Sequence, residues 1–187
     1  MRTLKQSTIL TLGLALLLPG TLKATELTNQ AKTRKEAVRL TQHIERTSLA
    51  IQKEADKLHA MSRTGQISNV SHKHGLRQIK NHVNEQLQPA FVRLAELKPA
   101  LPEWHQTAID KMHISATNLA LNADAAIVNR NPDGSGLLAW ADTDYKQYVA
   151  NIHERATVLA QVADATADYG SAQLKGHQAG LAITSHD

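Results

Sequence analysis

The side chains of this chain that are best suited to metal or proton chemistry are its ten histidines, because its 187 residues include no cysteine. Imidazole is a common metal ligand and titrates at about pH 6.5. A turn is expected near residue 66, between His59 on one side and His72 and His74 on the other. If the flanking segments form a helical hairpin, these three rings meet at one end of it and could bind zinc, copper or nickel.

Helical geometry argues against this metal site. Residues two apart on a helix point to nearly opposite sides, so His72 and His74 share an ion only if their segment is extended. Ser68 or Asn69, however, is a typical N-cap residue and predicts that the segment is already helical. Satisfied or solvated imidazoles are therefore the principal hypothesis, and the metal site is the alternative.

Four histidines adjoin the apolar pattern of the chain closely enough for their exposure to be predicted. His72 continues the apolar spacing of the residues that follow it, and His105 lies beside another inward position. Both rings are expected to be buried, and burial disfavours the charged form of an imidazole. His82 and His153 are expected to lie on partly exposed flanks.

Other kinds of catalysis lack the residues that they need. The absence of cysteine excludes a disulfide scaffold, a thiolate zinc site and a cysteine nucleophile. Di-iron bundles use a repeated Glu-x-x-His motif, whereas this chain has only one related pair, Asp110-x-x-His113. It has no Gly-x-Ser-x-Gly elbow and no glycine-rich phosphate loop, and its methionines are more typical of core filling than of haem ligation. We therefore expect a non-enzymatic protein without a cofactor.

Residues 1–24 have the organisation of a secretory signal peptide. Two basic residues precede the apolar run 9–18, Pro19 follows that run, and Ala24 is a small residue suited to cleavage. The run is shorter than the roughly 20 apolar residues that span a bilayer, and no later run is long and apolar enough. The mature protein is therefore predicted to be periplasmic or secreted and to have no transmembrane span.

The net charge of +4 is concentrated in the predicted signal peptide, which holds three of the 21 basic residues and no acidic one. The remaining chain carries 18 basic and 17 acidic side chains, so it is close to neutral. Aromatic residues make up only 3% of the sequence, which is few for stacking on bases. We therefore expect no nucleic-acid partner, and instead an unidentified protein or a small ligand.

Apolar residues beyond the signal peptide recur every three or four positions, which predicts helices. Four are expected, with breaks at 63–65, at Pro99 and at 129–136, a start at Pro102, a kink at Pro89 and a final stop at Gly170. Their inward stripes comprise Ala37, Leu40, Ile44, Ile51, Ala55 and Leu58; Leu76, Ile79, Val83, Leu87, Ala90, Leu94 and Leu97; Ile109, Met112, Ala116, Leu119, Ala123 and Ala126; and Tyr145, Val149, Ile152, Ala156, Leu159 and Ala163.

The predicted fold class is all-α. Four amphipathic helices joined by short connections pack most simply as a single antiparallel up-down-up-down bundle, here over residues 25–170. The alanines on the inward stripes of the third and fourth helices favour close packing over a ligand groove. Residues 171–187 have no apolar stripe and are expected to be a disordered tail.

One set of residues in the central third of the chain follows a particular order, namely Ser71-His72, Leu76, Ile79, His82-Val83-Asn84, Pro99, Trp104 and Ala108-Ile109-Asp110. This stretch resembles one found in uncharacterised exported helical proteins of soil bacteria. The resemblance implies a secreted helical protein and implies no site residue.

The sequence thus favours an exported, non-enzymatic helical bundle that serves as a binding, scaffold or stress-related interaction module. A histidine-based periplasmic metal-binding protein is the alternative hypothesis.

Overall fold

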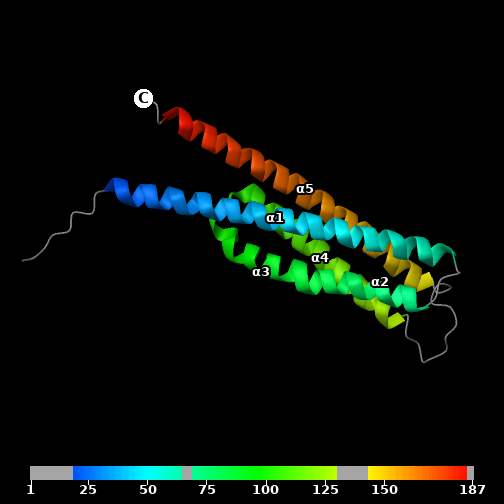
Figure 1. Ribbon diagram of the computed structural model, residues 1–187. Helices are drawn as coiled ribbons and strands as arrows, with labels where there is room; N and C mark the ends of the chain where they lie inside the picture. Colours follow the sequence, from blue (N-terminus) through cyan, green and yellow to red (C-terminus); the bar gives the residue numbers. More distant parts are fainter. Residues whose placement is uncertain (1–18, 65–68, 130–142, 185–187) are drawn as a thin grey trace, which may run out of the picture.

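The computed structural model describes residues 19–64, 69–129 and 143–184, with side chains over 27–63, 70–129 and 143–176 (Figure 1). All of these residues except Leu101 and Pro102 are helical, and none of them lies in a strand, as the apolar spacing predicts. The elements are α1 (Pro19–Thr64), α2 (Asn69–Asn81), the π-helical turn η1 (His82–Leu87), α3 (Gln88–Leu97), the short 3₁₀ helix η2 (Lys98–Ala100), α4 (Glu103–Asn129) and α5 (Thr143–Thr184).

The core is formed by the four predicted apolar stripes. Every residue of these stripes is buried, with at most 9% of its surface exposed, and together they form one hydrophobic cluster. Tyr145 is the largest of the fully buried side chains. Burial of this apolar surface is the main stabilising contribution to the packing of the helices.

Side-chain contacts show which helices lie side by side and in which direction they run. The Gln42 and Gln52 amides of α1 donate hydrogen bonds to Ser171 and Thr157 of α5, so residue numbers rise along one helix as they fall along the other. The ion pairs Lys80–Asp124 and Lys98–Asp110 give the same reversed order for α4 and the segment from α2 to η2 (residues 69–100), which we call the α2–α3 segment. Figure 1 shows α1 lying alongside both α5 and the α2–α3 segment.

The sequence predicts a kink at Pro89, and the structure has a π-helical turn that begins seven residues before it, at His82. Proline lacks a backbone N–H, and its ring clashes with the carbonyl group four residues before it. The chain widens into a π-helical turn over His82–Leu87, and the Gln88 N–H bonds to the Val83 carbonyl instead of to the next one. The helix then continues through Pro89 into α3, where Pro89 occupies the first turn.

The prediction that the last helix stops at Gly170 and is followed by a disordered tail is wrong for residues 171–184, because α5 continues to Thr184. Gly170 is buried within this helix against α1, and a Cβ atom there would lie 2.6 Å from Val38 Cγ2. The glycine therefore permits close packing and does not end the helix. Residues beyond it extend an existing helix, which avoids the unfavourable nucleation step, so they need no apolar stripe to be helical.

The structure describes the first helix from Pro19, inside the predicted signal peptide, to Thr64, and the residues on either side, 1–18 and 65–68, lie outside the described part of the chain. The turn predicted at 129–136 and Trp140 lie largely outside the described residues. Among residues 19–64, 69–129 and 143–184, no helix is long and apolar enough to cross a membrane.

Candidate functional site

A large hollow among the described residues lies between the N-terminal part of α1 and the C-terminal part of α5, and we call it the α1–α5 cleft. Figure 1 shows that these two ends project past α3 and α4 and separate from each other. The cleft has a volume of about 930 Å³. It is lined by α1 from Leu27 to Gln42, by the start of α4 and by α5 from Gly170 to Lys175.

The floor of the cleft is apolar and is centred on Trp104 in the first turn of α4. The indole ring stacks on the ring of His105, with ring centroids 4.7 Å apart and an angle of 14° between the planes. Tyr169 of α5 meets the same indole edge-on, at 4.6 Å and 86°. Val38 and Leu174 add aliphatic surface from the two flanking helices. Trp104 is partly exposed, so its ring is accessible from the cleft.

The rim of the cleft is basic. Its cationic side chains are Lys32, Arg34, Lys35, Arg39 and Lys175. None of these five forms an ion pair with another of the described residues. The Nε atom of Arg34 is shielded from solvent and has no hydrogen-bond partner in that part of the chain. A shielded guanidinium nitrogen without a hydrogen-bond partner is unfavourable.

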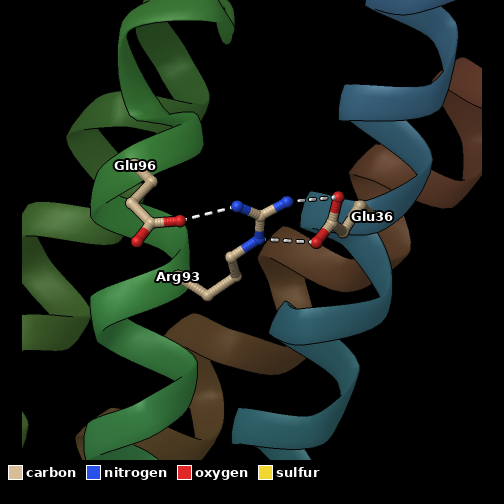
Figure 2. A network of polar contacts seen from close by, with 3 residues as sticks. All are labelled: Glu36, Arg93 and Glu96. Atoms are coloured by element: carbon tan, nitrogen blue, oxygen red, sulfur yellow. Dashed lines mark hydrogen bonds and ion pairs between the residues drawn. The ribbon is translucent and has the colours of Figure 1, made fainter.

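Among the residues whose side chains the structure describes, Glu36 has the only carboxylate on the cleft lining, and it is paired with Arg93, which is not part of that lining. Figure 2 shows Arg93 of α3 reaching across to Glu36 of α1 while also contacting Glu96 on its own helix. Arg93 Nε and Nη2 donate to the two Glu36 oxygens at 2.7 and 3.1 Å, and Arg93 Nη1 donates to Glu96 at 2.6 Å. The hydrogen bond from Arg93 lowers the pKa of Glu36, and the two glutamates raise the pKa of Arg93. The pairing fixes α1 to α3 and leaves the rim positive.

His105 lies beneath the floor of the cleft and is buried, as predicted. Burial lowers the pKa of His105, so its ring is neutral near pH 7. The Thr41 hydroxyl donates to the Ala37 carbonyl at 2.9 Å, and its oxygen lies 3.5 Å from His105 Nε2. Since the hydroxyl hydrogen is used on Ala37, the Thr41 oxygen accepts from an Nε2–H of His105.

The structure places two of the predicted metal ligands, His59 and His72, in separate surroundings. The His59 ring lies 5.5 Å from the ring of His153 on α5, and His153 Nε2 is 2.7 Å from an oxygen of Asp56. His72 is buried, as predicted, with its Nδ1 atom 2.7 Å from the Tyr145 hydroxyl. The two rings therefore have different partners on α5.

The third predicted ligand, His74, is exposed beside Gln78 and lines a second, smaller hollow of about 600 Å³. His82 lines the same hollow and is partly exposed, as is His153, which confirms the flank positions predicted for both. Among the residues that the structure describes, no group of three or more His, Asp or Glu side chains is arranged to hold a metal ion. The structure thus does not bring His59, His72 and His74 together.

The α1–α5 cleft was not predicted from the sequence, although the basic residues on its α1 side are recognisable there. Four cations between Lys32 and Arg39 form a dense basic cluster on α1. The α5 side of the cleft could not be recognised from the sequence. Gly170 suggested that the last helix ended there, whereas α5 lines the cleft from Gly170 to Lys175. Comparisons with protein-family models, curated proteins and solved structures gave no match to this chain.

Proposed function

We propose that this protein is an exported, non-enzymatic binding module that holds a small ligand in the α1–α5 cleft. The observation that carries the proposal is the cleft itself, with about 930 Å³ of space over an apolar floor. Small-molecule sites typically have volumes of about 300–1,000 Å³, with mainly apolar walls and a few polar groups that orient the ligand. The α1–α5 cleft has this size and this composition.

The same proposal includes an antiparallel up-down-up-down bundle as the scaffold. The reversed order of contacts between α1 and α5, and between the α2–α3 segment and α4, supports this topology. A bundle whose first and last helices extend past the other two leaves a hollow between the projecting ends. Export is supported by the signal-like organisation of residues 1–24.

Binding is favoured over catalysis by the state of the two groups in the cleft that are best suited to proton transfer. The carboxylate of Glu36 accepts two hydrogen bonds from Arg93. The Nε2 atom of His105 faces Thr41 beneath the floor. A general base must lie within hydrogen-bonding reach of the proton that it removes, and both groups are committed elsewhere.

The proposal can be tested with N-phenyl-1-naphthylamine, a neutral apolar dye that fluoresces more strongly in apolar surroundings. In a Trp140→Phe background, Trp104 is the only tryptophan, so energy transfer from it to the dye reports binding near the cleft floor. We expect saturable binding of one dye molecule per chain. Leu174→Gln, in the cleft, should weaken this binding, whereas Leu49→Gln, at an exposed position on α1 outside the cleft, should not.

Two results would contradict the proposal. One is the absence of saturable binding in a protein whose circular dichroism shows that it is folded. The other is an equal loss of affinity in the Leu174→Gln and Leu49→Gln variants, because the dye would then bind exposed leucines without regard to the cleft.

A further inference from the structure

We infer that the α1–α5 cleft selects an anionic amphiphile, that is, a small molecule with a carboxylate, sulfonate or phosphate group attached to an apolar body. This inference rests on the proposed function, since it requires that the cleft bind a ligand at all. It is carried by two features that occur together, a rim of five unpaired cations and an apolar floor.

The positive charge of the rim is a local property. Outside residues 1–24 the chain has almost equal numbers of basic and acidic side chains, so an even distribution would place carboxylates beside these cations. Among the described side chains that line the cleft, Glu36 has the only carboxylate, and it forms an ion pair with Arg93 (Figure 2). An anion entering the cleft therefore meets cations that form no ion pair with the described residues, although Arg39 lies close enough to Glu36 to help lower the pKa of that carboxyl.

The spacing of the cations on α1 has an energetic cost that an anion would offset. Lys32, Lys35 and Arg39 are separated by three and four residues, so they lie on one face of the helix. Like charges at these spacings destabilise a helix by a few tenths of a kcal/mol per pair. A bound anion between α1 and Lys175 of α5 replaces this repulsion by attraction.

Arg34 supplies the most specific contact for the anionic group. Its Nε atom is shielded and lacks a hydrogen-bond partner within the described part of the chain. The guanidinium group presents its donors in a rigid plane that matches two oxygens of a carboxylate, sulfonate or phosphate. The Arg34 guanidinium can pair with an oxyanion through its terminal nitrogens, a contact that a neutral ligand without an acceptor does not make.

The apolar floor explains why a simple inorganic anion is not the inferred ligand. Trp104, Val38 and Leu174 lie below the rim and present ring and aliphatic surface to the cleft. Covering this surface with an apolar body removes it from water, which inorganic phosphate cannot do. A ligand that joins an anionic group to an apolar body satisfies the rim and the floor together.

The test compares two dyes that differ in one group. 8-Anilinonaphthalene-1-sulfonate carries the same aromatic body as N-phenyl-1-naphthylamine and adds a sulfonate. We expect the sulfonate dye to bind about tenfold more tightly, which corresponds to about 1.4 kcal/mol. Arg34→Gln/Lys35→Gln should reduce the ratio of the two affinities to about one. The matched control Lys53→Gln/Lys73→Gln, which removes two exposed cations outside the cleft, should retain the preference.

The outcomes separate this inference from the proposed function. Equal affinities for the two dyes, with saturable binding that Leu174→Gln weakens, would overturn the anion preference and leave the binding function standing. Failure of both dyes to bind would overturn both.

Two further measurements distinguish the sources of the anion. Dodecanoate should displace the sulfonate dye, and displacement by inorganic phosphate at equal concentration would contradict the need for an apolar body. Binding to phosphatidylglycerol vesicles, without binding of either dye, would overturn the inference in favour of a membrane-facing basic surface.

Discussion

Replacement of Gly170 by alanine tests the packing at the inner end of the cleft. A Cβ atom at this position would lie 2.6 Å from Val38 Cγ2, about 1 Å closer than the usual carbon–carbon contact of about 3.5–4.0 Å. Overpacking of this kind costs about 1–3 kcal/mol, whereas alanine in place of glycine inside a helix contributes about 0.5–1 kcal/mol of stability. We therefore expect Gly170→Ala to lower the free energy of unfolding by up to about 2 kcal/mol.

Gly176 provides the matched control, because it lies in the same helix and a Cβ atom there would meet nothing within 4 Å. Gly176→Ala should therefore leave stability unchanged or raise it slightly, and the two variants should differ by about 1–3 kcal/mol in chemical denaturation. In the double variant Gly170→Ala/Val38→Ala, the clashing methyl is absent, so the two substitutions should be less harmful together than their sum. If Gly170→Ala is as favourable as Gly176→Ala and shows no coupling to Val38, the close contact between α1 and α5 does not exist.

Four other predictions follow from the structure. Truncation of a fully buried leucine should cost about 2–5 kcal/mol in chemical denaturation, and losses below about 0.5 kcal/mol would contradict the core assigned to Leu58, Leu87 and Leu119. Because burial lowers the pKa of His105, the unfolded chain binds more protons as the pH falls below the unfolded pKa of about 6.5. The melting temperature should therefore fall from pH 7.5 to pH 5.5, and it should fall less in His105→Gln; an equal fall in both proteins would exclude His105 as the cause. Calorimetry with zinc should show only weak binding that His72→Ala leaves unchanged, and one tight site lost in that variant would restore the metal hypothesis. N-terminal sequencing of the exported protein should give a start near Thr25, whereas a start at Met1 would refute cleavage.

The helices and the core residues could be predicted from the sequence because both depend on local periodicity. Apolar residues such as Ile44, Ile51 and Leu58 can face one core only if the chain turns every 3.6 residues, so their spacing indicates both the helix and its buried face. The burial of His72 and His105 could be inferred for the same reason. Each ring adjoins an inward stripe of its own helix, whatever that helix packs against.

The surroundings of the individual side chains could not be predicted from spacing along one helix. His59 was expected near His72 and His74 because these residues flank one turn, but its ring neighbour is His153 on α5. The partner of Glu36 is likewise on another helix, 57 residues away along the chain (Figure 2). Such contacts depend on how each helix is rotated about its axis, which is fixed by the packing of all the helices together.

The sequence by itself determined that this protein is helical, that one helix stops near Pro99 and the next starts near Pro102, and which apolar residues form most of the core, because these properties follow from local spacing and caps. Only the tertiary structure decided the role of Gly170, since a glycine can end a helix or allow a close contact, and the choice depends on whether Val38 lies against it. The tertiary structure also decided that the α1–α5 cleft exists. The basic side chains of α1 and the ring of Trp104 are more than 60 residues apart in the chain, and they line one hollow only because α5 continues past Gly170 and leaves α1 beyond that contact.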